Sequence, residues 1–198
     1  MSRRGVSGGT FVAALAAVAA GAALVWLATW LSPLVAADVA VRDGRLTDGL
    51  SEYRSAEARL ARVPALQQLA PSLLGGVQAN QVQLLYQMQR FDEAIEKAGR
   101  STSVHGTHFW SACAMFARGA AEEGAEARLA WFERAEAAFR EALTAAPQDW
   151  DTKYNYELTQ SLLNRLREEP ETPRRLLFQL LRPQAPRSGG KAPAKRTG

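Results

Sequence analysis

Two histidines and the single cysteine are the residues of this chain whose types could bind a metal ion. His105 and His108 lie three positions apart, so both could face one way on a helical turn, and Cys113 follows. A metal site needs three or four converging ligands, oriented by a surrounding shell of hydrogen bonds. No such set is recognisable here. We therefore expect ordinary histidines, a small buried cysteine and no cofactor. The alternative is that the protein is a metal carrier or an enzyme that uses these three residues.

Asp149 and Asp151 flank Trp150, and two carboxylates this close together could bind calcium. An EF-hand loop also needs ligands at alternating positions, an internal glycine and a terminal bidentate glutamate. These are missing from the sequence that follows. Asp149 instead comes directly before a helical pattern, where an aspartate accepts hydrogen bonds from free backbone amides. We therefore predict that Asp149 caps a helix.

Trp150, Tyr154 and Asn155 are the candidate residues for binding a protein partner. An exposed aromatic ring and an amide on one helix face could hold an extended peptide segment. We favour another interpretation, in which the two rings pack between helices and Asn155 bonds to the backbone. Elsewhere, no nucleophile with its base, phosphate-binding glycine loop or carboxylate pair is recognisable. The sequence thus predicts a binding protein that is not an enzyme.

The two ends of the chain are positively charged, and its middle is negatively charged. The whole sequence of 198 residues carries a net charge of +4. Residues 1–37 contain two arginines and no acid, while residues 170–198 contain seven lysines and arginines and one glutamate. The middle is therefore acidic, with a net charge of −4. Because a nucleic-acid-binding domain carries its positive charge on the folded surface, we expect no nucleic-acid partner.

A long apolar segment, Phe11–Leu31, lies close to the N-terminus. It contains no charged residue, and a helix of its length covers the roughly 30 Å hydrocarbon core of a bilayer. Trp26 and Trp30 lie near its far end, where indole rings favour the membrane interface. Pro33 is expected to end the helix. We therefore predict a leader at 1–10 and a transmembrane helix at 11–31.

The apolar segment has two further interpretations. It could be a signal peptide that is cut after Ala37, although its apolar region would then be unusually long, or a buried helix of a soluble protein. We favour an uncleaved anchor. A short leader with Arg3 and Arg4 stays in the cytoplasm, and the heavy use of alanine and arginine suggests a GC-rich bacterium. We therefore predict a single-pass protein of the inner (cytoplasmic) membrane with a periplasmic C-terminal domain.

The rest of the chain shows helical periodicity and no strand pattern of useful length. Leu46, Leu50, Tyr53 and Leu60 repeat at spacings of three, four and seven, which indicates one face of an amphipathic helix. Gly75–Gly76 is expected to end the helix after that one. The expected helices cover about 45–62, 66–74, 77–88, 91–98, 107–121, 128–145 and 150–166. We predict an all-α domain at 38–169, followed by a disordered basic tail at 183–198.

Part of this domain resembles the tetratricopeptide repeats. Ala135, Phe139, Ala142 and Pro147 match the spacing of the second helix of such a repeat. Residues 150–155 look like the start of the next repeat, and residues 91–95 resemble an earlier second helix. The resemblance implies a short, degenerate array of helix pairs that binds other proteins, in which small residues let paired helices approach closely.

A narrower resemblance rests on the phrase at residues 147–158 after an N-terminal anchor. This layout is similar to the MxaK-type membrane-anchored accessory proteins of bacterial gene clusters that pair a MoxR-type ATPase with von Willebrand factor A-domain proteins. The resemblance implies a scaffold that helps to assemble, or load metal into, an exported enzyme of the methanol-dehydrogenase type. Its partners would be von Willebrand factor A-domain proteins or an exported dehydrogenase. The alternative is a structural subunit of an envelope complex that acts through its transmembrane helix.

Overall fold

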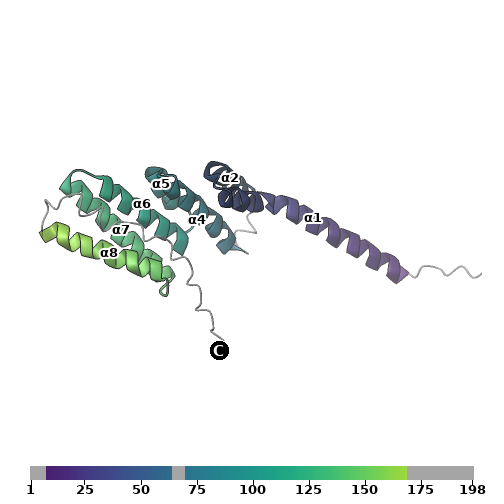
Figure 1. Ribbon diagram of the computed structural model, residues 1–198. Coiled ribbons are helices and arrows are strands. Elements are labelled where there is room, and N and C mark those ends of the chain that lie inside the picture. Colours follow the sequence, from purple (N-terminus) through teal and green to yellow (C-terminus); the bar gives the residue numbers. More distant parts are fainter. Residues whose placement is uncertain (1–7, 64–69, 169–198) are drawn as a thin grey trace, which may run out of the picture.

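The described part of the chain, residues 8–63 and 70–168 of a computed structural model, is entirely helical, which confirms the all-α class (Figure 1). Its helices are α1 (Gly8–Arg42), α2 (Leu46–Ala61), α4 (Pro71–Gln87), α5 (Phe91–Gly99), α6 (His105–Ala121), α7 (Ala125–Ala145) and α8 (Trp150–Glu168). The predicted tail at 183–198, most of the leader and the start of the helix expected at 66 lie outside the described residues.

Helix α1 is longer than the sequence predicts. It has 35 residues and passes through Pro33, so the expected end of the helix there is wrong. A proline inside a helix leaves the carbonyl four residues earlier, here that of Thr29, without its backbone donor. The hydroxyl of Ser32 and the guanidinium of Arg59 donate to that carbonyl instead, at 2.8 and 3.0 Å. The Thr29 carbonyl thus has one side-chain donor from α1 and one from α2 in place of the missing backbone donor, and the helix continues through the proline.

The two halves of α1 have different surroundings. From Val12 to Val25 its side chains are exposed, and the helix is long and apolar enough to cross a membrane. From Trp30 onward it packs on α2, with Ala37 and Ala40 buried. Gly49 permits this close approach, because a Cβ there would lie 2.6 Å from the side chain of Val41. The folded domain thus begins inside α1, before residue 38.

Helices α4 and α5 form the next pair. A sharp turn joins them, with Gln89 at a φ of 59°, and α5 begins at Phe91 as the sequence predicts. The expected helix end at Gly75–Gly76 is wrong, because α4 runs through both glycines. Gly75 is buried against Val104. This tertiary packing outweighs the low helix propensity of glycine, which is about 1 kcal/mol less favourable than alanine inside a helix.

Helices α6, α7 and α8 share the second part of the core. Phe132, Ala135, Phe139 and Ala142 of α7 are buried, as their helical spacing predicts. Helix α7 begins at Ala125, three residues earlier than expected. The reason is Arg128, whose buried guanidinium donates to the backbone carbonyls of Glu122 and Glu123 and so holds the turn after α6 close to α7.

The helices after α2 stack beside one another in chain order (Figure 1). Helix α4 contacts α2, α5 and α6, and α7 contacts α6 and α8. The stack extends away from the apolar half of α1, so that α8 lies at the opposite end of the molecule (Figure 1).

Candidate functional site

Helix α8 begins with the cap that the sequence predicts. The carboxylate of Asp149 accepts hydrogen bonds from the backbone N–H of Thr152, at 2.8 Å, and from its hydroxyl, at 2.5 Å. The Thr152 hydroxyl is the main cause that lowers the pKa of Asp149, and partial burial opposes it. These contacts confirm Asp149 as an N-cap, with its carboxylate turned to the backbone.

Trp150 and Tyr154 lie on the outside of α8. Their residues are 79% and 52% exposed. The favoured interpretation that both rings pack between helices is therefore wrong for the described part of the chain. The ammonium group of Lys153 lies 5.2 Å from the centre of the Trp150 ring, within the range of a cation–π contact. One turn of α8 thus presents two aromatic rings and a cation to the surroundings.

Asn155 does not extend this aromatic surface. Its side-chain amide donates to the backbone carbonyl of Asp151 at 2.7 Å, as the backbone-bonding interpretation predicts. The residue is only partly exposed. Of the three candidate binding residues, the structure brings Trp150 and Tyr154 together on one face and assigns Asn155 to the helix itself.

His105 joins α6 to the start of α8. Its Nε2 lies 2.9 Å from the hydroxyl of Thr152 and 3.5 Å from the carboxylate of Asp149, and its ring stacks on Phe109. A histidine beside a hydroxyl and an aspartate is also the arrangement of a hydrolytic triad. Here, however, Thr152 is 0% exposed and its hydroxyl donates to Asp149. A substrate cannot reach that oxygen, so the cluster holds two helices together.

His108 and Cys113 do not share a site with His105. The Nδ1 of His108 lies 2.9 Å from the carboxylate of Glu141, and its Nε2 lies 2.7 Å from the hydroxyl of Ser103. Cys113 packs in the apolar cluster of α6, α7 and α8, and burial raises the pKa of its thiol to about 12. Within the described residues, no group of three or more His, Cys, Asp or Glu side chains could hold a metal ion.

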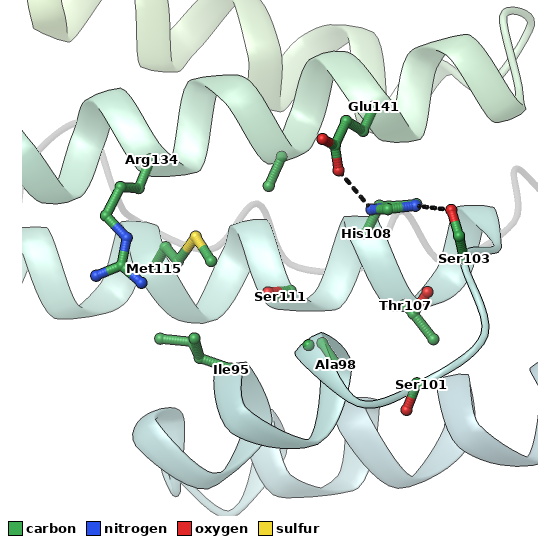
Figure 2. Close-up of a pocket in the computed structure, with 12 residues that line it drawn as sticks. Ile95, Ala98, Ser101, Ser103, Thr107, His108, Ser111, Met115, Arg134 and Glu141 are labelled. Carbon is green, nitrogen blue, oxygen red and sulfur yellow. Dashed lines mark hydrogen bonds and ion pairs between the residues drawn. The ribbon is translucent and has the colours of Figure 1, made fainter.

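A groove of about 420 Å³ lies over α6 between α5 and α7 (Figure 2). His108 and its two partners line one end, and Arg134 lies toward the other (Figure 2). Both ring nitrogens of His108 are engaged in these contacts. Sequence reasoning missed the groove, because its walls come from three separate helices and the loop before α6.

A half-buried polar cluster joins α2, α4 and α5, and sequence reasoning missed it too. The carboxylate of Glu57 accepts hydrogen bonds from Lys97, Gln78 and Gln81, at 2.6 to 2.8 Å. Burial by itself raises the pKa of Glu57, but the hydrogen bonds from Lys97 and the two glutamines together outweigh burial, so the pKa lies below its ordinary value. Because Glu57 is fully bonded within the protein, this cluster stabilises the fold and offers no open ligand site.

Comparison with family models, with curated proteins and with solved structures found no match to this chain.

Proposed function

We propose that this protein is a membrane-tethered scaffold, in which α1 crosses a membrane and the helical domain presents α8 to a protein partner. One observation carries the proposal. Trp150 and Tyr154 are exposed one turn apart on α8, and α8 is the helix at the end of the stack opposite the apolar half of α1 (Figure 1). Tryptophan and tyrosine are over-represented among the residues that anchor protein–protein interfaces.

The apolar half of α1 supports the tether. Val12 to Val25 are all exposed and include no charged residue. Such a continuous apolar surface is unfavourable in water and stable in a bilayer. Arg3 and Arg4 would hold the leader in the cytoplasm, so the helical domain would lie in the periplasm of a bacterium, at its inner membrane.

The packing of α7 supports a tetratricopeptide-like domain. Ala135, Phe139 and Ala142, which carry that resemblance, are all buried between α7 and its neighbours. Stacked helix pairs of this kind form extended binding surfaces. A tether confines such a surface to the membrane and raises the effective concentration of a partner that is also held there.

The resemblance to the MxaK-type proteins suggests the partner and the task. We propose a von Willebrand factor A-domain protein or an exported dehydrogenase as the partner, and its assembly or metal loading as the task. Such an accessory role requires binding and positioning, for which Trp150 and Tyr154 are available, and it requires no catalytic group of this chain.

The test is a pull-down of tagged full-length protein from crosslinked native membranes. We expect the wild type to recover a von Willebrand factor A-domain protein or an exported dehydrogenase, and Trp150→Ala/Tyr154→Ala to lose it. The matched control is Asn164→Ala/Arg165→Ala, which changes two exposed residues near the other end of α8. Equal recovery by all three proteins would contradict a binding site at the start of α8.

A second candidate function is a structural subunit of an envelope complex that assembles through α1. The observation that favours it is the uncovered apolar surface of α1, which other membrane helices could contact. Replacing residues 8–25 with an unrelated transmembrane helix separates the two functions. A scaffold keeps its partner after the exchange, whereas a subunit that assembles in the membrane loses its complex.

A further inference from the structure

We infer that the end of α2 beside α1, which carries Arg59 and Arg62, lies in the headgroup layer of the membrane and binds the phosphates of anionic phospholipids. This inference rests on the proposed crossing of the membrane by α1. It assigns the domain a lipid-binding surface and places the end of α2 at the depth of the lipid headgroups.

The contacts between α1 and α2 define the level of these arginines. The two helices are antiparallel, because Tyr53 bonds to Asp38 while Arg59, farther along α2, bonds to the earlier carbonyls of Thr29 and Trp30. Each step forward along α2 therefore corresponds to a step back along α1. Continued for three residues, this register places Arg62 level with Trp26.

The level of the arginines limits the depth to which α1 is immersed. A guanidinium in hydrocarbon is costly, so the apolar core of the bilayer must end close to Trp26. Residues Gly8–Val25 remain, and at 1.5 Å per residue they span about 27 Å, close to the roughly 30 Å that a bilayer requires. The immersed part of α1 thus ends nearly two helical turns before Leu31, the end that the apolar pattern alone suggests.

The tryptophans agree with this level. The rings of Trp26 and Trp30 stack with centres 6.1 Å apart, and Trp26 is 61% exposed. Indole rings concentrate where hydrocarbon meets the headgroups. Two indoles and two guanidiniums therefore occur within about one helical turn of each other along the joined helices.

The positive charges of Arg59 and Arg62 could bind a lipid phosphate. Arg59 bonds to backbone carbonyls, which are uncharged, and Arg62 is exposed and forms no ion pair with any described residue. Two carboxylates of α1 and α2 are engaged elsewhere, Asp38 with Tyr53 and Glu57 with Lys97. Among the described residues, neither arginine thus forms an ion pair with a carboxylate, and anionic headgroups would supply the counter-charge. Arg62 also complements the dipole of α2, but that effect does not depend on the lipid.

The height is tested on the full-length chain in a Cys113→Ser background, reconstituted in lipid vesicles. A fluorophore is attached at Ala61→Cys, beside Arg62, or at Ser161→Cys on α8, and the quencher is a nitroxide on the lipid headgroup. We expect strong quenching at position 61 and little at position 161. Equal weak quenching at both sites, in protein that resists alkaline extraction, would overturn this inference and leave the membrane crossing intact. Protein that alkali extracts would overturn both.

The phosphate preference is tested by moving the nitroxide from phosphatidylcholine to phosphatidylglycerol. We expect the anionic lipid to quench the label at position 61 more strongly than its share of the vesicle predicts. Arg62→Gln should lower this enrichment by up to about fivefold, as expected for one arginine near an anionic surface. The distal Arg165→Gln should not change it. The same quenching by both lipids, or no effect of Arg62→Gln, would contradict phosphate binding.

Discussion

The guanidinium of Arg59 donates a hydrogen bond of 3.0 Å to the backbone carbonyl of Thr29, the carbonyl that Pro33 leaves without its helical donor. The same nitrogen also donates to the carbonyl of Trp30, at 3.0 Å. Arg59 belongs to α2 and the carbonyls belong to α1. One side chain therefore supplies a donor that the proline removes from α1 and also joins α1 to α2.

This relationship predicts that Arg59→Gln destabilises the domain by about 1–3 kcal/mol, because it removes the two hydrogen bonds that the Arg59 guanidinium donates to the carbonyls of Thr29 and Trp30. Pro33→Ala restores the backbone N–H for the Thr29 carbonyl, so the cost of Arg59→Gln should be smaller in that background. A double-mutant cycle of urea unfolding in mild detergent measures the difference. Strictly additive effects of the two substitutions would show that Arg59 does not compensate for the proline.

The cluster around Glu57 predicts a stability that depends on pH. Folding lowers the pKa of Glu57 from its ordinary value of 4.5, so the stabilisation is present above that pH and is lost as the pH falls through the folded value. Glu57→Gln should cost about 1–2 kcal/mol near neutral pH, because Lys97 keeps a partly buried charge without its partner. The gap between wild type and variant, measured by urea unfolding, should narrow in acid. A gap that is independent of pH would exclude the charge as its cause.

Two adjacent glycines of α4 predict opposite effects of the same substitution. A Cβ on Gly75 would lie 2.7 Å from the Val104 side chain, whereas one on Gly76 would meet nothing within 4 Å. Gly75→Ala should therefore destabilise by about 1–3 kcal/mol through overpacking. Gly76→Ala should stabilise by about 0.5–1 kcal/mol, because alanine favours the helix. Thermal unfolding of both variants is the measurement, and a stabilising Gly75→Ala would contradict the packing of α4 on the loop before α6.

The cap at Asp149 predicts a local effect at the start of α8. Asp149→Ala should weaken the first turn by about 1 kcal/mol, so amide hydrogen exchange there should become about five times faster. Asp151→Ala is the matched control, since Asp151 is exposed and its backbone carbonyl, not its carboxylate, bonds to Asn155. Because the pKa of Asp149 is lowered from 3.8, the protection should be lost as the pH falls below that value. Equal exchange in both variants would mean that the cap does not stabilise α8.

Local features of the helical fold are predictable from the sequence because they depend on neighbours along the chain. The spacing of Leu50, Tyr53 and Leu60 predicts the buried face of α2, and Asp149 before a helical pattern predicts a cap. Pro33 and Gly75 show where such reasoning fails. Both residues weaken an isolated helix, and each is tolerated here because of a distant contact, Arg59 in one case and Val104 in the other.

The candidate site likewise has features that the sequence predicts and features that depend on tertiary packing. Residue types and their periodicity predict an all-α chain with one long apolar segment and single out Trp150, Tyr154 and Asn155, because both are local properties of the chain. The exposure of the two aromatic rings and the bond of Asn155 to its own helix follow from the packing of the helices. The tertiary structure also decided that Glu57 meets Lys97, and that α1 continues into the domain. Exposure and long-range pairing depend on which helices pack together, and that packing is set by contacts between residues far apart in the chain.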